Sequence, residues 1–149
     1  MPLDAVDLKI LCALRRDSRL SLRDIAAEAG VSAPSVNARI KRLEDEGVIT
    51  GYTVNLKPGT FGLALEALIL LTAPHSLRER LKGELDTMLA VSSCVTLTGP
   101  FSHAISASFP DVEKLTAFVE YLNENYGPTQ TSIVLSHEIP DRPPLDFKE

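Results

Sequence analysis

Apolar residues recur at helical spacing through the first third of the chain. Residues 3–16 place Val6, Ile10, Leu11 and Leu14 on one face, which predicts a helix. This segment begins with acidic residues and ends with basic ones, the charge order that complements a helix dipole. We expect this first helix to support a three-helix core rather than to contact a partner.

Residues 21–47 predict two more short helices joined by a glycine turn. Ser21 and Asp24 form a Ser-x-x-acid pattern, whose side chains can satisfy free amides at a helix start. The apolar positions that follow share one helical face: Leu22, Ile25, Ala26 and Ala29. Gly30 then breaks the period, because glycine tolerates the positive φ of a tight turn. We also expect Ala26 and Gly30 to lie where the two helices approach most closely.

The second of these helices begins at Ser32, an N-cap, and has Pro34 in its first turn, where a missing N–H costs little. Its inward stripe consists of Val36, Ile40 and Leu43. Two short capped helices joined by a glycine turn are typical of a helix-turn-helix.

The outward arc of this second helix is the candidate nucleic-acid surface. If the helix turns by about 100° per residue, the arc comprises Pro34, Ser35, Ala38, Lys41 and Arg42, flanked by Asn37 and Arg39. A helix in the major groove reads bases with its first turns and contacts phosphates with its flanks. We therefore predict base contacts from Ser35, Asn37 and Ala38. Phosphate contacts are predicted for Arg39, Lys41, Arg42, Ser21 and Arg23, and Ser32 and Pro34 complete the predicted DNA-binding set. An ordinary solvated basic face is the alternative interpretation.

Sequence rich in β-formers follows the helix-turn-helix. Residues 48–54 predict a small wing and a linking strand, so the first domain is expected to span residues 1–54. Residues 55–62, which contain Pro58 and Gly59, predict a linker.

The second half alternates between strand and helix periods. Strands are predicted at residues 63–73, 93–98, 102–109 and 129–139. Helices are predicted to open at a capping box on Ser76 and at Asp111, with inward residues Leu77, Leu81, Leu85, Met88 and Leu89 in the first and Leu115, Phe118, Val119 and Leu122 in the second. The order β-α-β-β-α-β is the ferredoxin-like arrangement. The sequence thus predicts an α+β protein, with an N-terminal winged helix-turn-helix, a ferredoxin-like domain over 63–139 and a poorly fixed tail at 140–149.

The net charge of −5 argues against DNA binding until the chain is divided. Residues 1–56 carry eight basic and eight acidic side chains, whereas residues 57–149 carry seven basic and twelve acidic ones. The acidity therefore belongs to the second half, and the basic groups of the first half cluster around the helix-turn-helix.

Other kinds of chemistry find little support in the sequence. His75, His103 and His137 show no metal-ligand spacing, and no nucleotide-binding glycine loop or nucleophile elbow occurs, so we expect no cofactor and no metal. We also find no leader pattern and no apolar run near 18 residues, and expect no membrane association. Cys12 and Cys94 lie on apolar segments, which favours buried free thiols in the cytoplasm.

Three groups of motif residues occur in order along the chain. The first group is Leu3-Asp4-x-x-Asp7-x-x-Ile10-Leu11, Ile25-Ala26 and Gly30-Val31-Ser32. The second is Val36-x-x-Arg39-Ile40-x-Arg42-Leu43-Glu44-x-x-Gly47-Val48-Ile49-x-Gly51-Tyr52. The third is Thr98-Gly99 with Thr129-x-Thr131-x-Ile133-Val134-Leu135. Together they resemble the Lrp/AsnC (feast/famine) family of transcription regulators along essentially the whole chain.

This resemblance implies an assembly and a ligand. It implies homodimers formed through the sheet domain, which assemble further, often to octamers. Each dimer presents two recognition helices to a pseudo-palindromic operator in double-stranded DNA. A small-molecule effector, usually an amino acid, is implied between dimers. The effector positions implied here are Gly99, Phe101, Ser102, His103, Thr129 and Thr131.

The sequence departs from the family in the effector turn. The family has Gly-Asp-aromatic-Asp there, whose carboxylates suit a ligand amino group. Pro100 and Ser102 replace both acids in this chain, so a ligand ammonium loses its charge-assisted partners. An amino-acid-like effector, a different ligand and no ligand all stay open, and His103 is alternatively a strand residue at a subunit contact.

A rival function comes from the enzyme class. Siroheme decarboxylases resemble this family in fold and use a histidine near the sheet domain. The second half of this chain has only Arg78, Arg80 and Arg142 to meet the many carboxylates of such a substrate. We therefore predict a transcription regulator and keep the siroheme-decarboxylase-like enzyme as the alternative.

Overall fold

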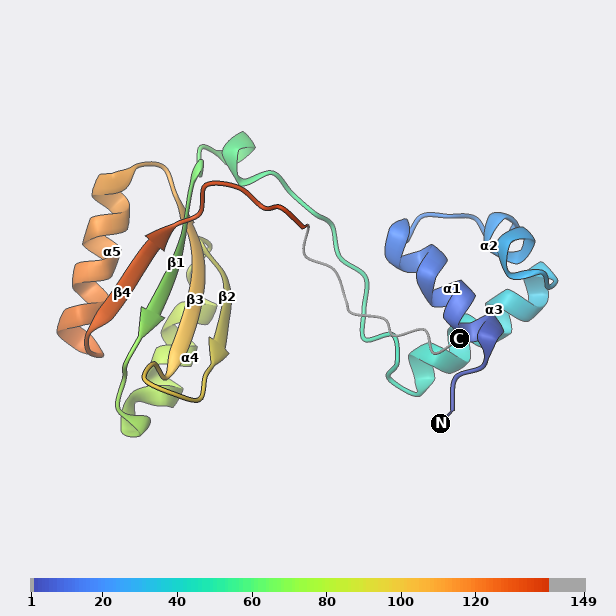
Figure 1. The fold of residues 1–149 in the computed structure, drawn as a ribbon, viewed down its shortest axis with the longest axis horizontal. Helices are drawn as coiled ribbons and strands as arrows, with labels where there is room; N and C mark the ends of the chain where they lie inside the picture. Colours follow the sequence, from blue (N-terminus) through green and yellow to red (C-terminus); the bar gives the residue numbers. More distant parts are fainter. Residues whose placement is uncertain (1, 140–149) are drawn as a thin grey trace. The chain divides into compact units, whose positions relative to one another are not determined.

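The computed structural model describes residues 2–139, and its contacts divide them into two units. The first unit extends to Asn55, and the second runs from Leu56 to Glu138. Figure 1 shows a bundle of helices in the first unit and a sheet with two helices in the second. No helix in the described part of the chain combines the length and apolarity needed to cross a bilayer. The tail predicted at 140–149 lies outside the described residues.

Three helices form the first unit: α1 (Ala5–Arg16), α2 (Leu22–Ala29) and α3 (Ala33–Asp45). The core between them contains Ile10, Ala13, Ile25, Ala26, Ala29 and Val36, with Val6, Leu14 and Ile40 packed against it. The apolar periods that predict these helices therefore also identify the faces that pack together.

Side-chain caps fix the starts of all three helices. Asp4 and Asp7 form a reciprocal capping box at α1. Ser21 Oγ accepts the Asp24 N–H at α2, and Ser32 Oγ accepts a backbone N–H at α3. Gly30, at the end of α2, has φ 75°, and a Cβ there has no neighbour within 4 Å. The backbone conformation therefore requires this glycine, and the predicted close approach of the helices at Gly30 is wrong.

The wing strands predicted at 48–54 are not formed. Residues 46–57 contain no strand, although Tyr52 donates a hydrogen bond to Glu44 on α3 at 2.8 Å. Tyr52, Val54 and Leu56 are all exposed, with 55%, 77% and 65% of their surface accessible. A strand needs a second strand to pair with, and the described chain brings none to this segment.

The second unit has the predicted ferredoxin-like order of elements. Its strands are β1 (Leu65–Leu71), β2 (Val91–Thr96), β3 (His103–Phe109) and β4 (Thr129–Ile133), and its helices are α4 (Arg78–Asp86) and α5 (Val112–Asn125). The strands form one antiparallel sheet in the order β2-β3-β1-β4. Figure 1 shows the four strands side by side, with β1 and β3 between β4 and β2.

One face of the sheet is covered by both helices. Ala67, Ile69 and Leu71 of β1 lie opposite Ala107, Ile105 and His103 of β3. The apolar residues among them join the helix residues Leu81, Leu85, Leu115 and Leu122 in one core. The other face is left open. It carries Leu68, Leu70 and Val95, of which Leu68 and Val95 are exposed.

Several predicted boundaries in this unit need correction. Ser76 does not cap α4, because a 3-10 turn over His75–Leu77 precedes the helix and Leu77 stands at its N-cap position. The helix ends at Asp86, so Leu89 lies beyond it and is 99% exposed instead of inward. Cys94 is exposed on the edge strand β2, and the prediction that it is buried is wrong. The strand predicted at 93–98 is shifted to Val91–Thr96, and the strand predicted at 129–139 ends at Ile133, where its pairing with β1 ends.

Two further contacts in the second unit involve the end of α5 and the side chain of Glu84 on α4. Gly127 ends the turn after α5 with φ 137°, and a Cβ there would lie 2.3 Å from the carbonyl oxygen of Thr72. Only glycine fits this approach. Glu84 of α4 accepts hydrogen bonds from the hydroxyls of Tyr121 and Tyr126, and Arg80 Nε donates to it at 2.9 Å.

Candidate nucleic-acid interface and ligand-binding end of the sheet

The exposed stripe of α3 is narrower than the sequence predicts. Val36 and Leu43 are fully buried, which fixes the inward direction of the helix. The exposed residues opposite them are Pro34, Asn37, Ala38 and Lys41, and we call these four the α3 stripe. The stripe presents an amide, a methyl group and an ammonium in successive turns, a set that suits base edges and phosphates.

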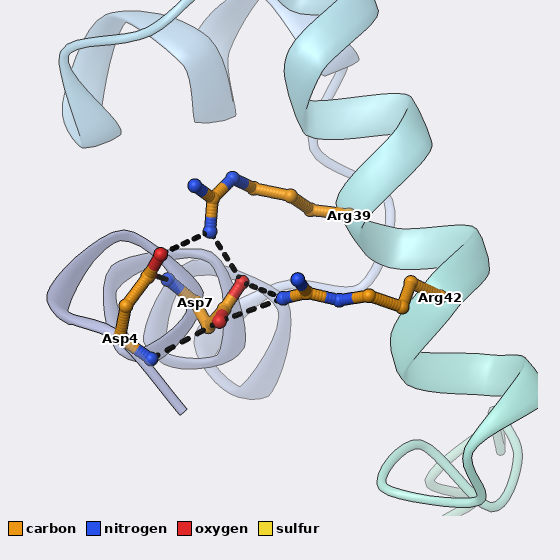
Figure 2. A network of polar contacts seen from close by, with 4 residues as sticks. All are labelled: Asp4, Asp7, Arg39 and Arg42. Atoms are coloured by element: carbon orange, nitrogen blue, oxygen red, sulfur yellow. Dashed lines mark hydrogen bonds and ion pairs between the residues drawn. The ribbon is translucent and has the colours of Figure 1, made fainter. Parts of the chain in front are cut away.

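Arg39, Arg42 and Ser35 lie on the flank of α3 that faces α1. Figure 2 shows both guanidinium groups reaching from α3 to the start of α1. Arg39 Nη1 donates to Asp4 Oδ2 and to Asp7 Oδ1, both at 2.7 Å. Arg42 Nη2 donates to Asp7 Oδ1 at 2.7 Å and to Oδ2 at 2.8 Å. The placement of Arg42 on the outward arc is therefore wrong, because its charged group is turned towards α1.

The centre of this network is a buried carboxylate. The side chain of Asp7 is 1% exposed, whereas those of Arg39 and Arg42 are 25% and 39% exposed. Two cations satisfy the buried charge, and Asp7 also accepts the Asp4 N–H at 3.1 Å. Buried carboxylates persist when they are paired and hydrogen-bonded in this way. The Asp4–Asp7–Arg39–Arg42 network thus fastens α3 to α1.

The network also changes the charge that α3 shows to solvent. The Asp7 N–H and the Arg39 guanidinium hold the pKa of the Asp4 carboxyl below its ordinary value. Hydrogen bonds to Asp4 and Asp7 raise the pKa of Arg39. Asp4 and Arg39 are therefore ionised at neutral pH, and the ion pairs with the aspartates offset the positive charge of the arginines. Lys41 is the basic residue of α3 that is exposed and lies outside this network.

The remaining predicted DNA-binding residues surround the start of α2 and α3. Ser21 Oγ donates to Asp24 Oδ2 at 2.6 Å and is occupied with capping. Ser32 Oγ accepts the Ser35 N–H at 3.4 Å. Arg23 is exposed on α2. Both serines therefore serve helix starts, and Arg23 presents its side chain to solvent.

The predicted effector residues gather at one end of the sheet. Leu71 of β1 pairs with both His103 and Thr129, so β3 and β4 begin beside it. Thr72, the next residue, donates from its N–H to Pro128 and from Oγ1 to Pro100. Thr72 thus ties the loop that contains Gly99 and Phe101 to the start of β4.

Hydrogen bonds within the chain already engage two of these residues. Ser102 Oγ accepts the Ala73 N–H at 2.8 Å and lies 3.0 Å from the carbonyl oxygen of Leu71. Thr129 Oγ1 donates to Asn123 at 3.0 Å. Thr131, in contrast, is exposed on β4.

His103 does not lie on the open face of the sheet. It is 6% exposed and shares the helix-covered face with Leu71 and Thr96. Its burial and the nearby charge of Arg78 lower the pKa of the imidazole. His103 is therefore a buried strand residue on the helix-covered face of the sheet.

Comparison with known proteins identifies both units. A family model described as winged helix-turn-helix DNA-binding matches residues 3–50. A second model, described as the Lrp/AsnC ligand binding domain, matches residues 66–144, more than half of the chain. The chain belongs to the Lrp/AsnC family. It is a DNA-binding transcription regulator whose second unit is the family's ligand-binding domain.

Lrp/AsnC relatives match nearly the whole chain. The HTH-type transcriptional regulator LrpC of Bacillus subtilis is 30% identical over 138 residues, which cover 91% of this chain and 94% of LrpC. The HTH-type transcriptional regulator PH0045 of Pyrococcus horikoshii is 34% identical over 143 residues, 91% of this chain and 92% of that protein. These matches confirm the family predicted from the motif residues.

Solved Lrp/AsnC structures share the fold. The structure of B. subtilis LrpC superimposes with a TM-score of 0.86 at 28% identity and covers 95% of this chain and 100% of LrpC. The complex of regulator NMB0573 from Neisseria meningitidis with L-Met gives a TM-score of 0.86 at 29% identity, with 97% of both chains covered. The predicted α+β class is confirmed by these matches.

Sequence reasoning missed the acidic half of the Asp4–Asp7–Arg39–Arg42 network. Asp4 and Asp7 stand in a motif and at a helix start, so the local pattern explains them as capping residues. Their second role is to pair with the arginines of α3. For Asp7, the partners Arg39 and Arg42 lie 32 and 35 positions further along the chain. A pair of acids and a pair of arginines, each three residues apart, was the available signal.

Proposed function

We propose that α3 is the recognition helix and that the α3 stripe enters the major groove of operator DNA. Asn37 and Ala38 meet base edges, and Lys41 meets a phosphate beside them. The observation that carries this proposal is the exposure of Pro34, Asn37, Ala38 and Lys41 directly opposite the buried Val36 and Leu43. An Asn side chain forms two hydrogen bonds with adenine, and a methyl group packs on thymine.

Arg39 and Arg42 take a different role in this proposal. Each guanidinium carries five N–H donors, and the network with Asp4 and Asp7 uses only some of them. The arginines hold α3 at its angle to α1 and offer their remaining exposed N–H groups to phosphates. Ser21, Arg23 and Ser32 lie at the helix starts, where backbone contacts to phosphate are common. Ser35 is partly buried and lies outside the α3 stripe.

The assembly we propose is a homodimer formed through the open face of the sheet. Leu68, Leu70 and Val95 give this face an apolar centre, and antiparallel sheets bury such a face against another layer. A two-fold dimer presents two copies of α3 to a pseudo-palindromic operator. Further assembly of dimers, up to an octamer, belongs to the same proposal, as does a place in the cytoplasm.

We propose further that the ligand-binding unit takes a small, amino-acid-like effector between dimers. The loop holding Gly99 and Phe101, together with Ser102, His103 and the threonines 129 and 131, is the expected region. The related NMB0573 was solved with L-Met, which supports an amino acid as the ligand class. Thermal shift with each of the twenty amino acids tests this, and the absence of any shift contradicts it.

The relatives favour a regulator over the siroheme-decarboxylase-like enzyme. The relatives named above are called transcriptional regulators, and the described residues contain no cluster of His, Cys, Asp and Glu that could hold a metal. Addition of a tetrapyrrole gives a direct comparison, because an enzyme of that class binds the chromophore and consumes it.

Selection of random DNA duplexes by the purified full chain tests the proposed function. We expect enrichment of a pseudo-palindromic sequence. Asn37→Ala should change the preferred bases at two symmetric positions, whereas Lys41→Gln should weaken binding to all duplexes alike. A selected pool indistinguishable from the starting pool overturns the assignment of α3.

A further inference from the structure

A pocket of about 540 Å³ opens between helix α4 and the edge strand β2. This volume lies within the range of small-molecule sites. Arg78 and Lys82 line it from α4, and Cys94 and Thr96 line it from β2. Of the effector residues named above, only His103 belongs to its lining.

Three polar side chains meet at the end of the pocket where α4 begins. Arg78 Nη2 donates to Thr96 Oγ1 at 2.7 Å, and Thr96 lies opposite His103 in the pairing of β2 with β3. Within residues 2–139, Arg78 forms no ion pair with a carboxylate. A half-buried guanidinium that is held by a neutral hydroxyl keeps spare donors and an uncompensated charge, which suit an anionic acceptor.

His103 borders the same end of the pocket. It is more than nine-tenths buried, yet it lines the pocket. Its Nδ1 lies 2.8 Å from Ser102 Oγ, so Nε2 is the ring nitrogen left for a ligand. Burial and, second to it, the nearby charge of Arg78 lower the pKa of this imidazole. Ser102 Oγ donates to the carbonyl oxygen of Leu71, so Nδ1–H of the neutral imidazole donates to Ser102. Nε2 is then a hydrogen-bond acceptor, which pairs with a donor of a ligand and not with its carboxylate.

Acidic residues also line the pocket, but at other positions. Asp86 follows Arg78 by eight residues on α4, about 12 Å along the helix axis. Glu79 is exposed to solvent. Leu81 and Leu85 form an apolar floor between the two ends. The pocket therefore favours an anionic group at the end with Arg78 and a carbon skeleton beside the leucines.

We propose that this pocket binds a small organic carboxylate, with its oxygens against Arg78 and Thr96 and its carbon skeleton over Leu81 and Leu85. The carboxylate accepts hydrogen bonds from the guanidinium and the hydroxyl, and Nε2 of His103 lies at the same end. The site is built within one chain. This inference shares one premise with the proposed function, namely that the second unit takes a small ligand. It adds that a carboxylate is the group recognised in this pocket.

NMR titration of the ¹⁵N-labelled full chain with sodium butanoate tests the proposal. We expect saturable shifts of the Cys94 and Thr96 amides and of the His103 ring. Three matched titrations use butylammonium chloride, which has the same chain without the carboxylate, sodium phosphate, and sodium chloride at equal ionic strength. The proposal requires butanoate to saturate these shifts while butylammonium and chloride do not. Saturation by phosphate but not by butanoate overturns the carboxylate class.

Variants then locate the anion. Arg78→Gln should weaken butanoate binding at least about tenfold, the loss expected for one charge-assisted hydrogen bond. Lys114→Gln removes one positive charge from the exposed first turn of α5 and should leave binding unchanged. If Arg78→Gln does not fold, Thr96→Val, which removes only the hydroxyl, should still weaken binding severalfold. Equal affinities in the wild type and either pocket variant overturn the proposal.

The same samples separate this inference from the proposed function. Binding to a selected DNA duplex is measured by fluorescence anisotropy without butanoate, and Arg78→Gln should bind DNA as the wild type does. DNA binding without saturable butanoate shifts overturns the pocket alone. Butanoate binding without DNA binding leaves the pocket supported and overturns the assignment of α3.

Discussion

Replacement of Asp7 by Asn should destabilise the first unit more than any other single charge removal there. The substitution keeps the size of the side chain but removes the charge that Arg39 and Arg42 share. It also directs an amide group at two guanidinium groups that have only donors. The capping role is partly retained, because the Asn carbonyl still accepts one N–H.

The size of the effect follows from burial. Removal of one partner from a buried ion pair costs about 3–5 kcal/mol. The two guanidinium groups are 25% and 39% exposed and regain some hydration, so we expect about 2–3 kcal/mol here. For a domain of this size, that loss lowers Tm by roughly 10–20 °C.

Circular dichroism at 222 nm on the full chain measures the change, at one fixed protein concentration because assembly shifts Tm. Hydrogen exchange of α1 and α3 shows whether the loss lies in the first unit. Asp45→Asn is the matched control, since it removes one negative charge from an exposed position on α3 and should change stability by less than about 0.5 kcal/mol. Equal Tm values for Asp7→Asn and Asp45→Asn refute the argument that the buried network holds α3.

Three further predictions concern charge and assembly. Lys41→Gln should lower the slope of log K against log salt for DNA by about one, whereas Lys114→Gln should not; an unchanged slope removes Lys41 from the phosphate contacts. Hydrogen bonds from Tyr121, Tyr126 and Arg80 hold the pKa of Glu84 at about 2 in the folded chain, below 4.5. This stabilisation is therefore complete above pH 4.5 and is lost as the pH falls towards 2, so the Tm difference between the wild type and Glu84→Gln should shrink over that range; a constant difference contradicts it. Leu68→Lys should convert the proposed dimer to monomers in sedimentation velocity, and an unchanged dimer excludes the open sheet face.

The sequence by itself determined the three helices of the first unit and the order of strands and helices in the second, but not the segment at 48–54. Helix starts at Asp4, Ser21, Ser32 and Asp111 depend on residues three positions apart, so the local pattern contains all the necessary information. The helical and strand periods likewise identify the inward faces, because burial repeats with the geometry of each element. These local signals were sufficient for the α+β class, and the ordered motif residues were sufficient for the family.

Only the tertiary structure decided which charges are free and which are paired. A helical wheel places Arg42 among the outward residues, because the wheel contains no information about the neighbouring helix. That helix, α1, brings Asp7 to the guanidinium of Arg42. The meeting of Arg78, Thr96 and His103 depends in the same way on a helix, an edge strand and a central strand packing together. The exposure of Cys94 follows from its strand lying at the edge of the sheet. Hydrophobic period reports whether a position is inward, whereas electrostatic partners depend on contacts between residues distant in sequence.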